Sequence, residues 1–433
     1  MRLTHISYLS LPFGPLLSYE FEAATLGNPL PISFDQERHV GLGERPGSWM
    51  ALAFRLPAPI RREHLAKAWE TVVAAHGTLR TVFTQSESGT LQLHEASLGN
   101  GNWTEHMISA GESMNAALQS VLDQGCRSFS LPAHRLCVVE TADGPTLVVA
   151  ADHAHVDMWS MLVIARDFLE ALAEINEGNE PEIEAAPAFA EHTKSLSERP
   201  SAPEEIHSRW QEVIEAGGGA MPRFPLPLGE PTIQPERVVV RDVLSREGLE
   251  KFSARAKEHG VSALALTISA MTSTTRESAG TALRAVFPVH SRYEDRWHDS
   301  VGWFITNSVL ESEDPDPEAC AKAVKESLRL GSHPLAEIMK PWGGMPEVPG
   351  MFAVSWLDMR RLPVSLDSKS IDAQYISAAI QTDGVMVWFI TDNAGIHLRC
   401  RFPDTLEARR NVGAWLDDLV ARMRREAEAE PSS

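Results

Sequence analysis

Strands and helices alternate along both halves of this chain, and a proline- and glycine-rich stretch separates the two halves. The stretch covers residues 196–236 and includes the run EAGGGAMPRFPLPLGEPTIQPE, whose composition is typical of a connecting loop. A chain of 433 residues is long for a single hydrophobic core, since domains usually hold about 100–200 residues. We therefore predict an α/β protein of two similar lobes, 1–195 and 237–433, joined by a connection at 196–236.

In the first lobe, the alternation leads to a short polar motif. The stretch RREHLAKAWETVVAAHGTLRTVF (61–83) begins as an amphipathic helix, and Gly77 is well placed to end it. The runs RLCVVET and PTLVVAA are separated by turn-forming residues, which predicts a β-hairpin. Helical spacing returns in residues 161–175. The motif DHAHVDMWS therefore lies between a buried strand and a helix.

Composition and charge exclude several classes of function. The formal net charge is −20, from 39 basic and 59 acidic side chains, which argues against a nucleic-acid partner. No apolar run reaches the roughly 18 residues of a membrane span, and the N-terminus lacks the order of a signal peptide. The four cysteines are scattered without a CxxC pair and are expected to be free thiols. We expect a cytoplasmic protein with no integral membrane segment.

A metal site is one interpretation of the motif. On an extended segment, His153, His155 and Asp157 would point to the same side and could converge on zinc. The spacing is similar to the HxHxDH stretch of metallo-β-lactamase-like hydrolases. Met158, however, stands where the last ligand would be, and a thioether is a poor ligand for a hard cation. We therefore expect no metal in the site.

Two further interpretations need no metal. Histidines at the end of a strand can be structural, satisfied by backbone partners. Alternatively, His153 acts as a general base, because a neutral imidazole accepts a proton at neutral pH, and Asp157 holds the local turn.

The motif and four other stretches carry a resemblance to a known family. DHAHVDMWS resembles the HHxxxDGxS motif of the condensation-domain and CoA-dependent acyltransferase superfamily. In the same order along the chain, AWETVVAAHGTLRTVF, KEHGVSALALTISAM, FPVHSRYEDRWHDSVGWFITNSV and GMFAVSWLDMRRLP resemble further family stretches. The sequence looks most similar to the actinobacterial polyketide-associated acyltransferases.

The resemblance implies both a fold and a mechanism. It implies two chloramphenicol-acetyltransferase-like lobes in a V, with a central substrate tunnel and His153 near its middle. His153 would be the catalytic general base, and Asp157 would be structural, paired with Arg292. By the same resemblance, Trp303 and Asn307 would lie near the acceptor channel.

This sequence departs from the family motif at two positions. Asp152 stands in place of the first histidine, where it would line the substrate tunnel and its charge could raise the basicity of a neighbouring imidazole. Met158 replaces the usual glycine and could narrow a substrate channel or shift the loop. Ser160 is expected either to line the tunnel or to cap the helix that starts at Met161.

The function that follows is acyl transfer in lipid or natural-product biosynthesis. The donor would be an acyl thioester, on CoA or on the phosphopantetheine of a carrier protein, and the acceptor a small alcohol or amine. The thioester is a substrate, and no cofactor is expected. The alternatives are a catalytically degenerate, condensation-like scaffold or carrier-protein-binding module, which Asp152 and Met158 favour, and a metallohydrolase.

Overall fold

The computed structural model describes residues 1–22 and 25–429, which form two compact units of mixed α/β structure. The prediction of two α/β lobes is confirmed. The division along the chain differs from the expected one, because residues 292–305 and 362–379 belong to the first unit. The first unit comprises 1–199, 292–305 and 362–379, and the second comprises 200–291, 306–361 and the chain from 380 onward.

Long-range pairing explains why two later segments join the first unit. Residues 374–377 form the short strand β14, which inserts between β1 and β4. The segment 292–305 is attached through Arg292, whose guanidinium binds Asp157. The pairing of β14 leaves no local pattern in the sequence.

The first unit contains a seven-stranded sheet, a three-stranded sheet and the helices packed on them. Its strands are β1 (Arg2–His5), β2 (Leu16–Phe21), β3 (Thr25–Leu30), β4 (Trp49–Arg55), β5 (Thr81–Gln85), β6 (Leu91–Ser97), β7 (Gly101–His106), β8 (His134–Val139), β9 (Thr146–Asp152) and β14 (Gln374–Ser377). Its helices are η1 (Ile6–Tyr8), α1 (Phe34–Gly41), α2 (Arg62–Ala75), η2 (Gly77–Arg80), α3 (Met114–Gly125), η3 (His153–His155), α4 (Met158–Asn176), α5 (Phe189–Ser197) and η4 (Asp295–Trp297).

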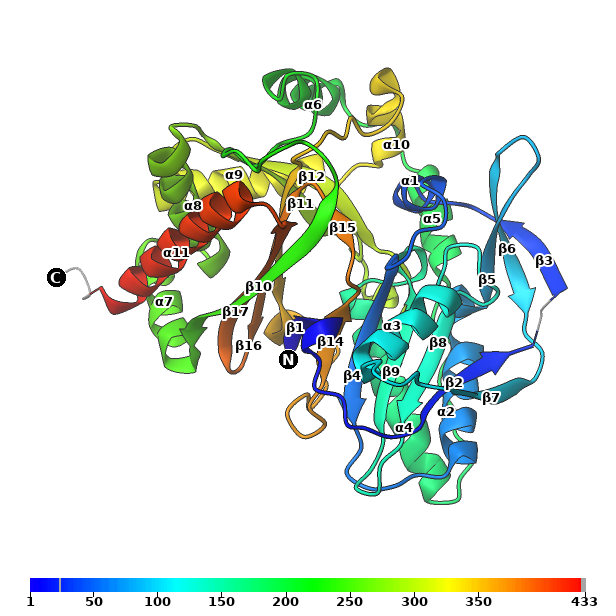
Figure 1. Ribbon diagram of the computed structural model, residues 1–433. Helices are drawn as coiled ribbons and strands as arrows, with labels where there is room; N and C mark the ends of the chain where they lie inside the picture. Colours follow the sequence, from blue (N-terminus) through cyan, green and yellow to red (C-terminus); the bar gives the residue numbers. More distant parts are fainter. Residues whose placement is uncertain (23–24, 430–433) are drawn as a thin grey trace. The chain divides into compact units, whose positions relative to one another are not determined.

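The large sheet of the first unit has β9 near its centre. The strand order is β1-β14-β4-β9-β8-β2-β7, and β9 is antiparallel to both of its neighbours. The predicted hairpin is confirmed as β8 and β9. Every residue of β9 is buried, so both faces of the sheet are covered there, because neighbouring side chains in a strand point to opposite faces. Helices α2 and α4 pack side by side (Figure 1).

The second unit has its own seven-stranded sheet, in the order β12-β11-β13-β16-β17-β10-β15. The strands are β10 (Gln234–Ser245), β11 (Leu283–His290), β12 (Ile305–Ser312, whose first residue belongs to the first unit), β13 (Phe352–Asp358), β15 (Gln381–Thr382), β16 (Val385–Asp392) and β17 (Gly395–Pro403). The helices are α6 (Glu204–Ala216), α7 (Arg246–Glu258), α8 (Ala263–Ala279), α9 (Pro317–Leu330), α10 (Leu335–Ile338), η5 (Lys340–Trp342), η6 (Met359–Arg361) and α11 (Leu406–Glu428).

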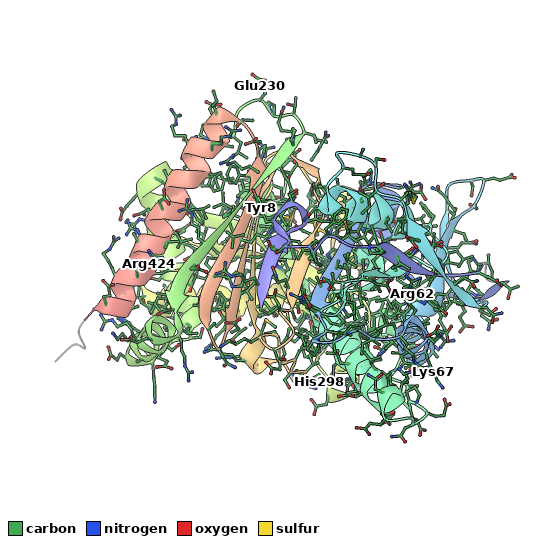
Figure 2. All side chains as sticks on the ribbon, turned by 60° about the horizontal axis from the view of Figure 1, so that its bottom comes forward. Tyr8, Arg62, Lys67, Glu230, His298 and Arg424 are labelled. Atoms are coloured by element: carbon green, nitrogen blue, oxygen red, sulfur yellow. The ribbon has the colours of Figure 1, made fainter. Side chains whose placement is uncertain are left out.

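The core of the second unit lies between this sheet and the helices α7, α8, α9 and α11, which gather beside it (Figure 1). Arg424, labelled in Figure 2, lies on α11 and donates hydrogen bonds to two backbone carbonyls of β10. The predicted connection is only partly loop, because residues 204–216 form α6. In residues 1–22 and 25–429, no helix has both the length and the apolarity to cross a bilayer.

Candidate functional site

The polar motif connects the centre of the first sheet to the start of α4, as the sequence predicts. Strand β9 ends at Asp152, η3 follows, and α4 begins at Met158. Each turn is fixed by a carboxylate: Asp152 accepts a hydrogen bond from the Ala154 amide, and Asp157 accepts one from the Ser160 amide. Between Asp152 and Ser160, only His153 and Met158 are partly exposed, and the other residues are buried.

Asp157 and Arg292 form a buried ion pair, as the resemblance implies. The Arg292 Nη1 atom donates to Asp157 Oδ2 at 2.6 Å, and Nη2 donates to Oδ1 at 3.2 Å. Both residues are 2% exposed, so Arg292 is not a solvated surface arginine. Burial acts to raise the pKa of Asp157, but the charge and hydrogen bonds of Arg292 outweigh it and hold that pKa below its usual value.

Other donors of Arg292 bind backbone carbonyls. Its Nε donates to the Trp297 carbonyl, and Nη2 also donates to the Ser300 carbonyl. The guanidinium lies 3.9 Å from the centre of the Phe304 ring, and the Phe304 amide donates to Asp157 at 3.0 Å. His298, labelled in Figure 2, accepts a hydrogen bond from the Trp159 indole through its carbonyl. The pair therefore joins the segment 292–305 to the motif.

Ser160 differs from both roles expected for it. It is fully buried, and the helix cap is Asp157, because α4 begins at Met158 and not at Met161. The Ser160 hydroxyl accepts from Arg292 Nη2 at 2.8 Å and from the Gly302 amide at 3.1 Å. It can donate its single hydrogen to Asp157 Oδ1 or to the Gly302 carbonyl. A hydroxyl with these partners has no free capacity for a substrate.

His153 contrasts with this satisfied network. Its ring lies 4.2 Å from the ring of Trp303, centre to centre, with a tilt of 36°. Its Nδ1 atom is buried and has no hydrogen-bond partner in any other described residue. Because the residue is partly exposed and Nδ1 is covered, Nε2 is the ring nitrogen available to another molecule.

The surroundings of His153 favour the neutral imidazole. Burial, followed by the charge of His39, lowers its pKa to about 4, against the opposing effects of its own carbonyl, Asp152 and Asp157. A histidine with this pKa is unprotonated at neutral pH and keeps a lone pair on one ring nitrogen.

Asp152 lies deeper than the sequence suggests. It is 0% exposed, which differs from the expectation that it lines a substrate channel. The hydroxyls of Ser48 and Ser128 donate to its Oδ2 at 2.7 and 3.1 Å. Burial acts to raise the pKa of Asp152, but its contact with His39 and smaller contributions from His155 and Ser48 lower it overall. The carboxylate is therefore ionised and enclosed.

The three residues considered as zinc ligands point to different partners. Asp157 binds Arg292, whereas the ring of His155 lies against Phe83, with centres 5.4 Å apart. The rings of His153 and Trp303 pack together. Within residues 1–22 and 25–429, no group of three or more His, Cys, Asp or Glu side chains is arranged to hold a metal ion.

The other predicted site residues fall in both units. Met158 is partly exposed, its backbone φ is not positive, and its carbonyl accepts a hydrogen bond from Tyr375 at 2.7 Å. The loop therefore accommodates methionine without backbone strain. Trp303 contacts His153, as described above, whereas Asn307 belongs to the second unit, on β12, and its contact with a substrate stays a prediction.

Sequence reasoning missed His39, Ser48 and Ser128. His39 lies in the last turn of α1, with its Nε2 atom 3.4 Å from Asp152 Oδ2. All three residues are distant from the motif along the chain, so no spacing rule connects them to it. A buried aspartate after an apolar strand requires hydrogen-bond donors, and this requirement was the one available signal.

Comparison with known sequences gives matches along most of the chain. The sequence profile described as Condensation domain matches residues 42–329, more than half of the chain. The isonitrile lipopeptide synthase of Mycobacterium tuberculosis is 24% identical over 462 residues, covering 95% of this chain but only 17% of that protein. CymA, a probable non-canonical nonribosomal peptide synthetase of Salinispora arenicola, is 27% identical over 66% of this chain and 4% of its own length. The chain therefore spans a small part of these relatives.

A shorter relative has a more similar length. The acyltransferase PapA3 of Mycobacterium tuberculosis is 24% identical over 330 residues, which cover 71% of this chain and 67% of PapA3. Among solved structures, the PapA2 acyl transferase superimposes with a TM-score of 0.87 at 17% identity, over 99% of this chain and 100% of that one. The first condensation domain of the CDA synthetase gives a TM-score of 0.72 at 15% identity, over 94% of this chain and 97% of that one. These structures share the two-lobe fold of this chain.

Proposed function

From the premise that this chain belongs to the condensation-domain family and is an acyltransferase, we propose that His153 is the general base of a transfer from a thioester to an alcohol or amine. The observation that supports this most is the contrast within the motif. His153 is its one partly exposed ionisable side chain, and it is surrounded by buried residues. A general base needs such exposure together with a free lone pair.

The proposed reaction is a direct transfer. His153 Nε2 takes the proton of the acceptor hydroxyl or amine while the acceptor oxygen or nitrogen bonds to the thioester carbonyl carbon. The carbon–sulfur bond then breaks, and the protonated His153 returns its proton to the thiolate. The products are an ester or amide and a free thiol, and no covalent enzyme intermediate is required.

The low pKa of His153 leaves its lone pair free for the first proton transfer, although it weakens the base, and it favours the second. With a pKa of about 4, the ring is unprotonated at neutral pH and ready to accept a proton. Once protonated, the imidazolium is a strong acid, which favours transfer of the proton to the departing thiolate, because a thiol holds a proton far more tightly. The indole of Trp303 restricts the orientation of the ring.

The proposed substrates follow the relatives. Nonribosomal peptide synthetases and PapA proteins among the matches support an acyl or peptidyl thioester donor, on CoA or on carrier-protein phosphopantetheine. We place the reaction in lipid or natural-product biosynthesis. The acceptor would be a small alcohol or amine.

The decisive experiment compares His153→Ala with a matched histidine variant. Purified protein is incubated with a panel of acyl-CoA and acyl-carrier-protein donors and with alcohols or amines, and products are detected by mass spectrometry. Loss of the general base should lower the rate by about 10²–10⁴-fold. His64 of α2, a partly exposed histidine that bonds Asn176, is the control, and His64→Ala should keep the wild-type rate.

The same experiment distinguishes the non-catalytic alternative, which the departures at Asp152 and Met158 favour. A scaffold or carrier-protein-binding module would retain a loaded carrier protein without forming product, in the wild type as in the variant. Equal product formation by wild type and His153→Ala would instead refute the role of His153 as base.

A further inference from the structure

Helix α1 is fixed directly to the motif loop. Ser33 and Gln36 form a capping box at the start of the helix, and the Gln36 Nε2 atom donates to the Ala154 carbonyl at 2.8 Å. Gln36 is 1% exposed, so this bond is shielded from water. The anchor holds His39, one turn further along α1, at a fixed place beside the motif.

His39 contacts the first two residues of the motif, Asp152 and His153. Its Nε2 atom lies 3.4 Å from Asp152 Oδ2, and its ring centre lies 5.9 Å from that of His153. The same ring packs edge-on against Trp303, with centres 5.2 Å apart. His39, His153 and Trp303 therefore form one group of rings, and the Asp152 carboxylate lies next to the His39 ring.

The neighbours of His39 define its neutral tautomer. Arg45 Nη2 lies 3.2 Å from His39 Nδ1, and a guanidinium can only donate. Nδ1 must then accept, so Nε2 carries the hydrogen and points it toward the Asp152 carboxylate. Asp152 is held in turn by two serine hydroxyls and the Ala154 amide, which leaves it little freedom to move.

We propose that His39 and Asp152 form a pair of positioning residues, which hold the ring of His153 against Trp303 and set the charge around it. This inference builds on the proposed role of His153 as general base. In this chain, the aspartate at the motif's first position thus acts together with a histidine from α1.

The two members of the pair act on His153 with opposite sign. Positive charge on His39 lowers the pKa of His153, whereas negative charge on Asp152 raises it. Two further charged or titratable groups lie beside the pair: Arg45, next to His39 Nδ1, and His155, which lies 4.0 Å from Asp152 and has its own pKa lowered by burial. Asp157 also raises the pKa of His153.

The test is a titration of the His153 ring, followed by NMR in protein with labelled histidines. His39→Asn removes the side chain whose charge interaction lowers the pKa of His153, so the titration midpoint of His153 should shift upward by about half a unit or more. Asp152→Asn removes the anion and should shift it downward by a similar amount. His64→Asn is the matched control and should leave the midpoint unchanged.

Opposite shifts in the two variants would support the pair, because a purely structural role predicts no such sign reversal. Unchanged midpoints in both variants, or shifts in the same direction, would overturn it. Folding of each variant is checked by its thermal transition, and His39→Gln provides a second substitution at that position if Asn prevents folding.

The activity assay separates this inference from the proposed function. If His153 is the base, the acid limb of the kcat/KM profile should move with the NMR midpoint of each variant. An active His153→Ala protein would refute the proposed function while leaving the titration result intact. Unshifted midpoints alongside an inactive His153→Ala protein would refute only the pair.

Discussion

Two side chains of one short motif, Asp157 and His153, have opposite surroundings. Asp157 is enclosed and accepts hydrogen bonds from Arg292, Ser160 and the Phe304 amide. His153 is partly exposed, and its buried Nδ1 atom has no hydrogen-bond partner in any other residue that the structure describes. Asp157 therefore stabilises the fold, whereas the Nε2 atom of His153 stays available to another molecule.

The comparison matters because both residues look alike in the sequence. Each is a polar residue after an apolar strand, and each belongs to the same HxxxD spacing. Burial of a polar group costs free energy unless partners compensate for it, so a buried, fully bonded side chain is expected to be structural, whereas a chemical role requires an accessible atom. If this distinction holds, substitutions at the two positions should differ in whether they lower stability or activity.

The largest expected effect on stability comes from Arg292→Met. The change leaves the Asp157 carboxylate buried without a counter-charge, and we expect a loss of about 3–5 kcal/mol in the free energy of unfolding. Urea denaturation at neutral pH measures it. Arg127→Met, which removes an exposed pair with Glu44, is the control and should cost no more than about 1 kcal/mol. A similarly small loss of unfolding free energy for Arg292→Met would remove the distinction between Asp157 and His153.

The pH dependence of the unfolding free energy tests the surroundings of His153. The folded-state pKa of His153, about 4, lies below the ordinary value near 6.5, so the unfolded chain binds the proton first. Its contribution is therefore complete above pH 6.5 and is lost as the pH falls to about 4. His153→Phe should lose less stability than wild type over this window, by about 1–3 kcal/mol. Parallel stability curves for the two proteins would contradict the lowered pKa.

A smaller effect is expected for Ser160→Ala. The variant removes a buried hydroxyl that bonds Asp157, Arg292 and Gly302, and we expect a loss of about 1–2 kcal/mol in unfolding free energy. Ser197→Ala, at the exposed end of α5, should change stability by less than about 0.5 kcal/mol. If Ser160 instead lined a substrate channel, the variant would alter KM while leaving the urea midpoint in place.

Local pattern predicted much of the fold. The helix predicted at the start of the stretch 61–83 appears as α2, and the apolar runs before the motif appear as β8 and β9, because side-chain periodicity reports directly on which face is buried. The strand β14 could not be found this way. It has four residues, and its place between β1 and β4 depends on pairing with strands more than 300 positions away.

The sequence predicted the site where a residue's role follows from the family motif. It did not do so where the role depends on residues far away along the chain. The pairing of Asp157 with Arg292 followed from the resemblance and is present in the structure. The burial of Asp152 did not follow, because it depends on Ser48 and Ser128, which only the folded chain brings to it. His39 was missed for the same reason.

Met158→Gly should have the smallest effect on stability. It tests Met158, the second partly exposed residue of the motif. Met158 is the first residue of α4 and does not have a positive φ, so glycine brings only its lower helix propensity, a cost of at most about 1 kcal/mol. The side chain should instead limit the size of the acceptor, so the variant should gain kcat/KM for bulkier alcohols or amines. Met158→Leu, which keeps the volume, should retain the wild-type acceptor profile. Identical profiles for glycine and methionine would place the side chain outside the substrate path.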